Sequence, residues 1–168
     1  ILECQLTAPF KILRAAQPHI KKLFLKEKEN GINNFRKVVN ISSTSGMFGN
    51  AGQINYATAK AGVVGMAKTM AKEWGRYNVN VNAVGFGLIK TRLTDSDAEK
   101  EESLIDIEGN KIKVGVNSAV FQSAKTMIPL GRPGTPQEAA GAIYMFCIPE
   151  SNYVTGQILM CHGGGFGY

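Results

Sequence analysis

Residues 38–62 open with Val38-Val39-Asn40-Ile41-Ser42-Ser43, pass through a loop marked by three glycines, and close with Asn55-Tyr56-Ala57-Thr58-Ala59-Lys60-Ala61-Gly62. The first run is short, β-branched and bounded by turn residues, which is typical of a strand buried in a parallel sheet. The second run lies in a predicted helix over 53–76, whose alanines and glycines allow another backbone to approach closely. A strand, a Gly-rich loop and a long helix in this order predict an α/β unit.

Strand and helix patterns alternate along the whole chain. A helix is predicted over 1–26, where apolar residues recur at near-helical spacing, although Pro9 and Pro18 each remove an N–H donor. Further strands are predicted over 37–43, 78–84 and 157–161. The alternation favours one α/β domain with a parallel sheet.

The later part of the chain carries a second helix signal and a variable segment. Thr135 and Glu138 predict a capping box, with Pro136 in the first helical position, for a helix that runs to Phe146. Residues 95–128 lack a steady period. They predict a small hairpin over 105–116 and a short helix over 117–127.

Composition excludes several classes of protein. The 168 residues are 44% hydrophobic and 19% charged, which is typical of a globular chain, and no apolar run is long enough for a membrane span. Cys4, Cys147 and Cys161 show no Cys-x-x-Cys spacing, and with only His19 and His162 no metal cluster is expected. We expect a reducing compartment, the cytoplasm or alternatively the mitochondrial matrix.

The net charge of +6 is concentrated near the start. Residues 1–40 hold eight of the basic side chains against three glutamates. Such a patch fits an anionic partner, a nucleic acid or an acyl-carrier protein, but it is also what a solvated helix face looks like. Because no aromatic residues are interleaved with the charges, we favour the solvated face and expect no nucleic acid.

Three side chains in residues 38–62 can move a proton. Tyr56 and Lys60 are four residues apart on the predicted helix and therefore share one face. A neighbouring ammonium favours the phenolate form of a phenol, which then acts as an acid or base at a carbonyl or alcohol oxygen. Ser43, at the carboxyl end of the preceding strand, lies where ligands bind in open α/β sheets. Taken alone, the pair is equally well an interfacial tyrosine and a surface lysine, because short motifs arise by chance.

The setting of this pair resembles the short-chain dehydrogenase/reductase family, above all its 3-oxoacyl-(acyl-carrier-protein) reductase and 3-hydroxyacyl-CoA dehydrogenase branches. The resemblance covers essentially the whole chain. It rests on five motifs: Asn40-Ile41-Ser42-Ser43, Asn55 to Gly62, Val81-Asn82-Ala83-Val84 followed by Gly87-Leu88-Ile89-Lys90-Thr91, Pro129-Leu130-Gly131-Arg132-Pro133-Gly134, and Tyr153-Val154-Thr155-Gly156-Gln157.

The resemblance implies a catalytic set. Tyr56 would be the acid or base, Lys60 would favour the ionised phenol and bind the nicotinamide ribose, and Ser43 would polarise the substrate carbonyl. The family's fourth catalytic residue is an Asn, and Gln5 stands in its place here.

The resemblance also implies a cofactor site and a substrate. NADP(H) or NAD(H) would supply the hydride, with NADP(H) favoured by family analogy, and the substrate would be a small molecule or an acyl thioester. Besides Tyr56 and Lys60, the residues expected to contact the cofactor are Gly87, Ile89 and Thr91. Residues 95–128 would form the variable substrate segment, and a homodimer or homotetramer is expected.

Other departures set this chain apart from the family pattern. Phe86-Gly87 replaces the usual Pro-Gly, and His162-Gly163-Gly164 replaces Asp-Gly-Gly. For His162 we favour contact with a neighbouring subunit over a catalytic role.

The phosphate-binding half of the family fold is not seen in the sequence. The strands would be the fifth, sixth and seventh of a doubly wound Rossmann-type sheet, with strand 37–43 as a bare edge. We therefore expect a longer biological protein. The alternative is an inactive relative that acts as an oligomer-forming or interaction subunit.

Overall fold

A computed structural model of the chain describes residues 1–91, 104–107, 110–113, 123 and 126–165. Three parallel strands form its sheet: β1 (Arg36–Ser43), β2 (Val79–Phe86) and β5 (Ile158–Cys161), in the order β1-β2-β5. The three predicted strands are thus confirmed, as is their adjacency. Within the described residues β1 pairs with β2 alone, so its outer edge is bare, as expected.

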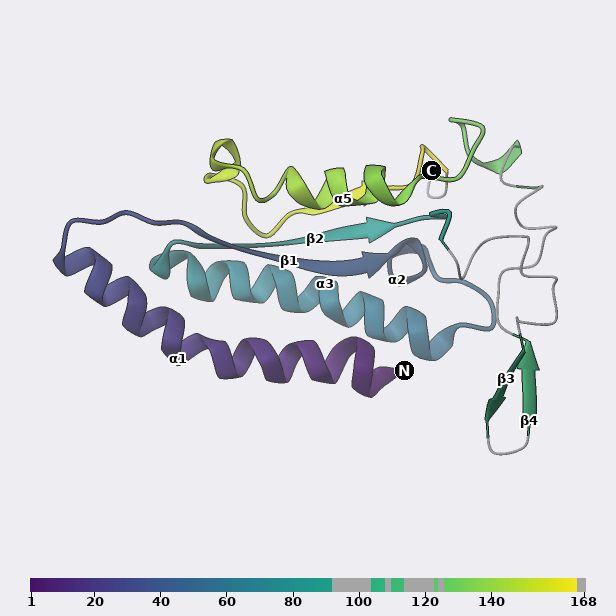
Figure 1. The fold of residues 1–168 in the computed structure, drawn as a ribbon, viewed down its shortest axis with the longest axis horizontal. Helices are drawn as coiled ribbons and strands as arrows, with labels where there is room; N and C mark the ends of the chain where they lie inside the picture. The colour runs from purple at the N-terminus through teal and green to yellow at the C-terminus, as the bar shows by residue number, and fades with distance from the viewer. Residues whose placement is uncertain (92–103, 108–109, 114–122, 124–125, 166–168) are drawn as a thin grey trace.

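Helices cover both faces of this sheet (Figure 1). α1 (Ala8–Glu29) and α3 (Ile54–Trp74) lie on one side, and α5 (Pro136–Tyr144) lies on the other. Side chains of α3 and β2 form the core of the first side, and α5 packs on the second side against Val84. The α/β class predicted from the alternation is confirmed. No helix in the described ranges is both long enough and apolar enough to span a membrane.

The N-terminal helix differs in detail from the predicted one. It begins as a π-helix, η1 (Glu3–Thr7), and α1 continues to Glu29 rather than to residue 26. Pro9 falls in the first turn of α1, directly after η1, so the helix runs through a residue that has no N–H to donate. Pro18 is accommodated inside α1.

The Gly-rich loop is not a loop throughout, and this part of the prediction was wrong. A short helix, α2 (Thr44–Phe48), follows β1 directly. Ser43 caps it by accepting a hydrogen bond from the Ser45 amide at 3.2 Å, and Gly49 ends it with a φ of 78°.

The observed bounds of β2 also differ from the predicted range 78–84. A break was predicted after residue 84, but β2 continues through Gly85 and Phe86 because β5 pairs with both of them. After α3 the chain turns through the 3-10 helix η2 (Gly75–Tyr77) and through Asn78 at a φ of 55°.

Two asparagines fasten the segment before β5 to β2. Asn80 donates to the carbonyl of Asn152, and Asn82 donates to the carbonyl of Val154 while accepting from the amide of Gln157. Both amides are buried, and these bonds satisfy backbone groups that no strand partner reaches. A 3-10 helix, η5 (Pro149–Ser151), precedes this segment.

The predicted hairpin is confirmed by β3 (Leu104–Ile107) and β4 (Asn110–Lys113), which pair antiparallel over a narrower range than 105–116. The predicted helix over 117–127 lies largely outside the described residues, and so does most of the variable segment 95–128.

The predicted capping box at the start of α5 is confirmed. The Thr135 hydroxyl accepts from the Glu138 amide, and the Glu138 carboxylate accepts from the Thr135 amide at 2.8 Å. Arg132 adds a two-pronged ion pair to the same carboxylate, at 2.6 and 2.8 Å. The Arg132 guanidinium first, and Thr135 second, lower the pKa of Glu138 from its ordinary 4.5 to about 2.

The Glu138 carboxylate should make the folded chain less stable as the pH falls. Since its pKa is lower in the folded chain, its contribution is present in full above about pH 4.5 and disappears as pH falls through about 2. The variant Glu138→Gln removes it at every pH. We therefore expect the difference in urea midpoint between wild type and variant to be largest at pH 6–7 and to shrink between pH 4.5 and 2.

Arg132→Gln supplies the control, because it removes the main cause of the shift. In a double-mutant cycle at pH 7 the second substitution should then cost less than it does alone. A midpoint difference that stays constant from pH 7 to pH 2.5 would contradict the assignment.

Candidate functional site

The candidate site lies where β1 and β2 end side by side. Ser43 is the last residue of β1 and pairs in register with Phe86, the last residue of β2. The Ser43 side chain is buried, and its hydroxyl oxygen accepts the capping bond that starts α2. The hydroxyl hydrogen of Ser43 remains a donor, which is the role expected of this residue.

Lys60 reaches the same strand end from α3. Its side chain is 6% exposed, and its ammonium donates to the carbonyl of Ile41 at 3.0 Å. Burial lowers the pKa of the Lys60 ammonium below its ordinary 10.5. A buried lysine whose ammonium is hydrogen-bonded to a backbone carbonyl rather than to a carboxylate is unusual, because buried lysines normally have an acidic partner.

Tyr56 lies one helical turn before Lys60 and is half-buried. Its ring centroid is 5.6 Å from the Lys60 ammonium nitrogen. This distance is within the range in which a cation is attracted to the face of an aromatic ring. The structure therefore brings Tyr56 and Lys60 together beside the strand end that carries Ser43.

The contacts that Ser42 and Gly46 make with Lys60 were not predicted from the sequence. The hydroxyl of Ser42 donates to the backbone carbonyl of Lys60 at 2.9 Å. Gly46, in α2, lies so close that a Cβ there would be 2.6 Å from the Lys60 carbonyl carbon. The glycine three residues beyond Ser43 was a signal for such an approach, but its partner, fourteen residues away, could not be read.

The segment from Gly87 to Thr91 begins directly beyond β2. The amide of Gly87 donates to the Cys161 carbonyl at 3.0 Å, which keeps the segment alongside the end of β5. A Cβ at Gly87 would lie 2.6 Å from the His162 Cβ, so only glycine fits there.

A second strand-like contact fixes the middle of this segment. Ile89 forms an isolated parallel bridge with Gly134, whose amide donates to the Leu88 carbonyl and whose carbonyl accepts from the Lys90 amide. The Ile89 side chain packs against Gly134, where a Cβ would lie 2.8 Å from Ile89 Cδ1. Thr91 is the last described residue before position 104. Ser43 and the predicted cofactor segment therefore occupy adjacent strand ends.

Gln5 lies within η1, a π-helical turn of the kind often found at functional sites. The next residue, Leu6, packs on α3 at Gly62, where a Cβ would lie 2.9 Å from Leu6 Cδ1. Gln5 is half-buried and stands on an element that contacts α3 two residues beyond Lys60. Its role as the fourth catalytic residue stays a prediction.

His162 serves a local turn. Its Nδ1 accepts from the Gly164 amide at 3.1 Å, and its Cβ backs onto Gly87. Its expected contact with a neighbouring subunit stays a prediction. Among the described residues no group of three His, Cys, Asp or Glu side chains is placed to hold a metal ion.

The chemistry of the cluster is that of a proton donor beside a fixed cation. Tyr56 offers a phenol and Ser43 a hydroxyl, and Lys60 supplies a positive charge screened from water. The segment 87–91 begins at the adjacent strand end, directly beyond β2. This set fits the nicotinamide and ribose part of a dinucleotide cofactor.

Comparison with known proteins finds matches that cover nearly the whole chain. A family model described as enoyl-(acyl carrier protein) reductase matches residues 1–165. The 3-oxoacyl-(acyl-carrier-protein) reductase of Thermotoga maritima is 37% identical over 164 residues, which cover 98% of this chain and 55% of that protein. The protein of the same name from Synechocystis sp. is 36% identical, covering 98% and 54%.

Solved structures agree on the fold. A 4-hydroxyisoleucine dehydrogenase complexed with NADH matches with a TM-score of 0.70 at 23% identity, covering 98% of this chain and 57% of that one. The chain spans about half the length of the curated relatives it matches. The family model matches residues 1–165, the first of these relatives is 37% identical over 98% of the chain, and the chain belongs to the short-chain dehydrogenase/reductase family.

Proposed function

We propose that the protein carrying this chain is an NAD(P)-dependent oxidoreductase that interconverts a 3-oxoacyl and a 3-hydroxyacyl thioester. The observation that supports this most is the buried Lys60 ammonium, held beside Tyr56 at the strand end that carries Ser43. The names of the relatives, 3-oxoacyl-(acyl-carrier-protein) reductases, supply the substrate class.

The proposed proton transfer follows from the residues of this chain. In the reducing direction the Tyr56 hydroxyl gives its proton to the substrate carbonyl oxygen, while Ser43 donates a hydrogen bond to the same oxygen. The phenolate that remains is stabilised by the Lys60 ammonium. An ammonium has three N–H donors, of which the Ile41 carbonyl takes one.

A nicotinamide cofactor, when bound, supplies the hydride. Lys60 and the segment from Gly87 through Ile89 to Thr91 are the residues of this chain that would hold it. Family analogy favours NADP(H), whereas the dehydrogenase of similar fold was solved with NADH, so both cofactors belong in the assay.

The description of the matching family model raises a second candidate, reduction of an enoyl thioester. The same tyrosine and lysine would then serve an enolate oxygen, because hydride addition to the double bond places negative charge on the thioester oxygen. A saturated product distinguishes it from the first candidate. The inactive, oligomer-forming relative remains the alternative, on account of Gln5 and Phe86.

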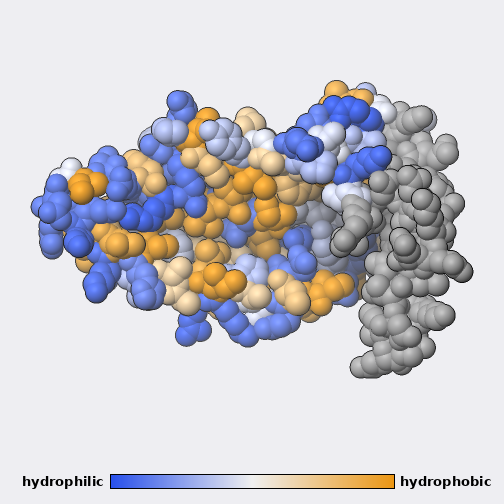
Figure 2. All heavy atoms as spheres, in the orientation of Figure 1, coloured by the Kyte–Doolittle hydropathy of each residue, from blue (hydrophilic) through white to orange (hydrophobic). Residues whose placement is uncertain are grey.

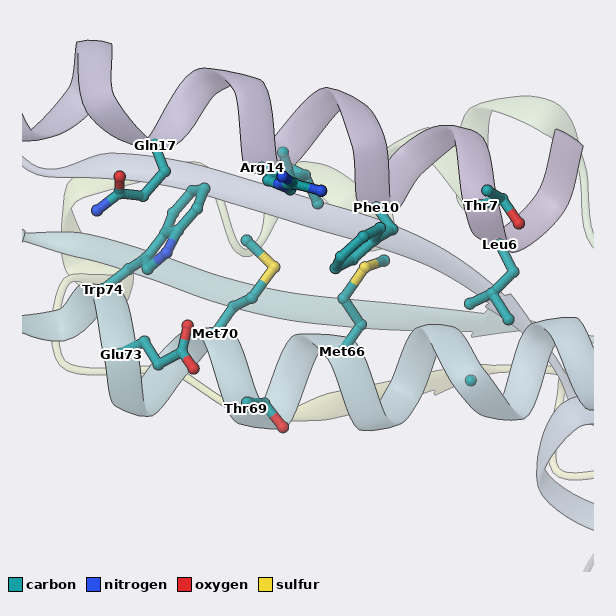
Figure 3. Close-up of a pocket in the computed structure, with 12 residues that line it drawn as sticks. Leu6, Thr7, Phe10, Arg14, Gln17, Met66, Thr69, Met70, Glu73 and Trp74 are labelled. Atoms are coloured by element: carbon teal, nitrogen blue, oxygen red, sulfur yellow. The ribbon is translucent and has the colours of Figure 1, made fainter. Parts of the chain in front are cut away.

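We also propose that the protein forms a homodimer through α1 and α3. An apolar groove of about 740 Å³ runs between these helices, into which Phe10 and Leu6 of the N-terminal helix and Met66, Met70 and Trp74 of α3 project (Figure 3). Figure 2 shows apolar residues across the middle of the molecule, over α3 and the strands beside it. In the groove, Phe10 is 50% exposed. A two-fold pairing of this face would bury one apolar surface against its copy.

A homotetramer through the C-terminal tail is the larger assembly expected from the family. Tyr153, which is fully exposed, and the neighbouring tail are the surface for it. The cytoplasmic or mitochondrial location stays a prediction.

Replacement of Tyr56 by Phe tests the proposed reaction. Loss of the proton donor should lower kcat for acetoacetyl-CoA reduction by about 10²- to 10⁴-fold, measured as oxidation of NADPH or NADH at 340 nm on the whole protein. Tyr144→Phe is the control, because this tyrosine is 67% exposed on α5 and should leave the rate unchanged.

Equal rates in wild type and Tyr56→Phe would remove Tyr56 from the mechanism. Oxidation of NADPH or NADH in the presence of crotonyl-CoA, but not of acetoacetyl-CoA, would favour the second candidate, reduction of an enoyl thioester. Absence of cofactor binding in a whole protein that is folded would favour the inactive relative.

Replacement of Phe10 by Glu tests the dimer. A charge in the apolar groove cannot be hydrated once two copies meet there, so light scattering at micromolar concentration should give a monomer mass, or half the wild-type mass. Ile32→Glu is the matched control, since Ile32 is 51% exposed and lies outside the groove. A Phe10→Glu protein with the wild-type mass would exclude this face as the interface.

A further inference from the structure

We propose that Ser42 and Gly46 are positioning residues that set the place of Lys60, an inference whose catalytic consequence rests on the proposed function of that lysine. Neither residue belongs to the proposed catalytic set. Both reach Lys60 through its backbone, from two different elements.

The first contact ties α3 to β1 at Lys60. Ser42 is 2% exposed, and its hydroxyl donates to the Lys60 carbonyl at 2.9 Å, while the neighbouring Ile41 carbonyl accepts from the Lys60 ammonium at 3.0 Å. Two adjacent residues of one strand thus hold the two ends of one lysine. The side chain between them is fixed at both ends, which restricts a group that otherwise has about 2 kcal/mol of rotamer entropy.

The second contact sets the depth of α3. A Cβ at Gly46 would lie 2.6 Å from both the carbonyl carbon and the Cβ of Lys60, and 2.8 Å from the Ala61 amide nitrogen. These atoms belong mostly to backbone and cannot swing aside. Any larger residue at position 46 therefore moves α2 and α3 apart at Lys60.

The Ser42 bond is not demanded by the helix itself. The Lys60 carbonyl lies inside α3, where helical geometry already gives it a partner one turn on. Loss of the hydroxyl therefore leaves no orphaned carbonyl and should cost only about 1 kcal/mol of stability. What it removes is the lateral tie that holds Lys60 to the strand end.

Loss of the Ser42 hydrogen bond should change the pKa of the Lys60 ammonium. Tyr56, on α3, is the titratable group that lies beside this ammonium. The other neighbouring elements present groups that do not titrate: the Ile41 carbonyl and the Ser42 hydroxyl from β1, and Gly46 from α2. Glu3 of η1 is paired with Lys11 at 2.8 Å. Burial is thus the cause that lowers the pKa of Lys60, and a looser Lys60 that gains water should titrate closer to 10.5.

The test is an NMR titration of the lysine ammonium groups in the whole protein, with the Lys60 signal assigned by its loss in Lys60→Arg. In Ser42→Ala the Lys60 pKa should rise towards 10.5 relative to wild type. Gly46→Ala should move it in the same direction, and it keeps the test decisive where Ser42→Ala does not fold.

Matched controls exist for both substitutions. Ser151→Ala removes another buried hydroxyl that donates to backbone carbonyls, those of Phe146 and Ile148, away from Lys60. Gly65→Ala adds a methyl group to α3 where nothing lies within 4 Å. Both should leave the Lys60 titration at its wild-type value.

Activity separates this inference from the proposed function. With both correct, Ser42→Ala lowers kcat for acetoacetyl-CoA reduction about tenfold or more at nearly constant KM, because a displaced charge acts mainly on the transition state. An inactive wild type with a shifted Lys60 pKa in the variants would overturn the function and keep the positioning. Folded Ser42→Ala and Gly46→Ala proteins with wild-type Lys60 titrations would overturn the positioning.

Discussion

A lysine ammonium buried beside the end of a parallel strand is the constraint on which the rest of this structure depends. Transfer of such a cation from water is costly, and the partner that holds Lys60 is a backbone carbonyl rather than a carboxylate. That carbonyl belongs to Ile41, two residues before the end of β1. The same strand end supplies Ser43, and one turn of α3 supplies Tyr56. A site with a proton donor and a fixed charge follows from one crossover, β1–α2–α3.

The parts of the fold with a local signal were predictable. The β-branched run before Ser43 predicted β1 because a buried parallel strand has no polar face to show. Thr135 and Glu138 predicted the start of α5 because a capping box is complete within four residues. The pairing of Tyr56 with Lys60 followed from helical spacing alone.

The parts of the fold that depend on contacts between residues far apart in the sequence could not be predicted. α2 was expected as a loop, since three glycines lie within or just after it and glycine disfavours a helix. Ser43 nevertheless caps this helix, and Gly46 allows its close approach to Lys60. The extension of β2 to Phe86 depends on pairing with the end of β1 on one side and, on the other, with Met160 and Cys161, some 75 residues later. Ser42 gave no signal of its own, because a serine beside another serine has no periodicity to mark which of them contacts the helix.

Within the described residues the outer edge of β1 has no strand partner. In the same strand the side-chain nitrogen of Asn40, Nδ2, is buried without a hydrogen-bond partner, a state that costs about 1–3 kcal/mol. The curated relatives are nearly twice as long, with this chain covering about 55% of the first of them.

A crystal structure of the whole protein with its nicotinamide cofactor bound tests the central claim most directly. The account predicts that the Lys60 ammonium stays within hydrogen-bond distance of the Ile41 carbonyl, with the Tyr56 and Ser43 hydroxyls facing the same bound molecule. A Lys60 side chain that turns out to solvent, with the cofactor bound elsewhere, would contradict it.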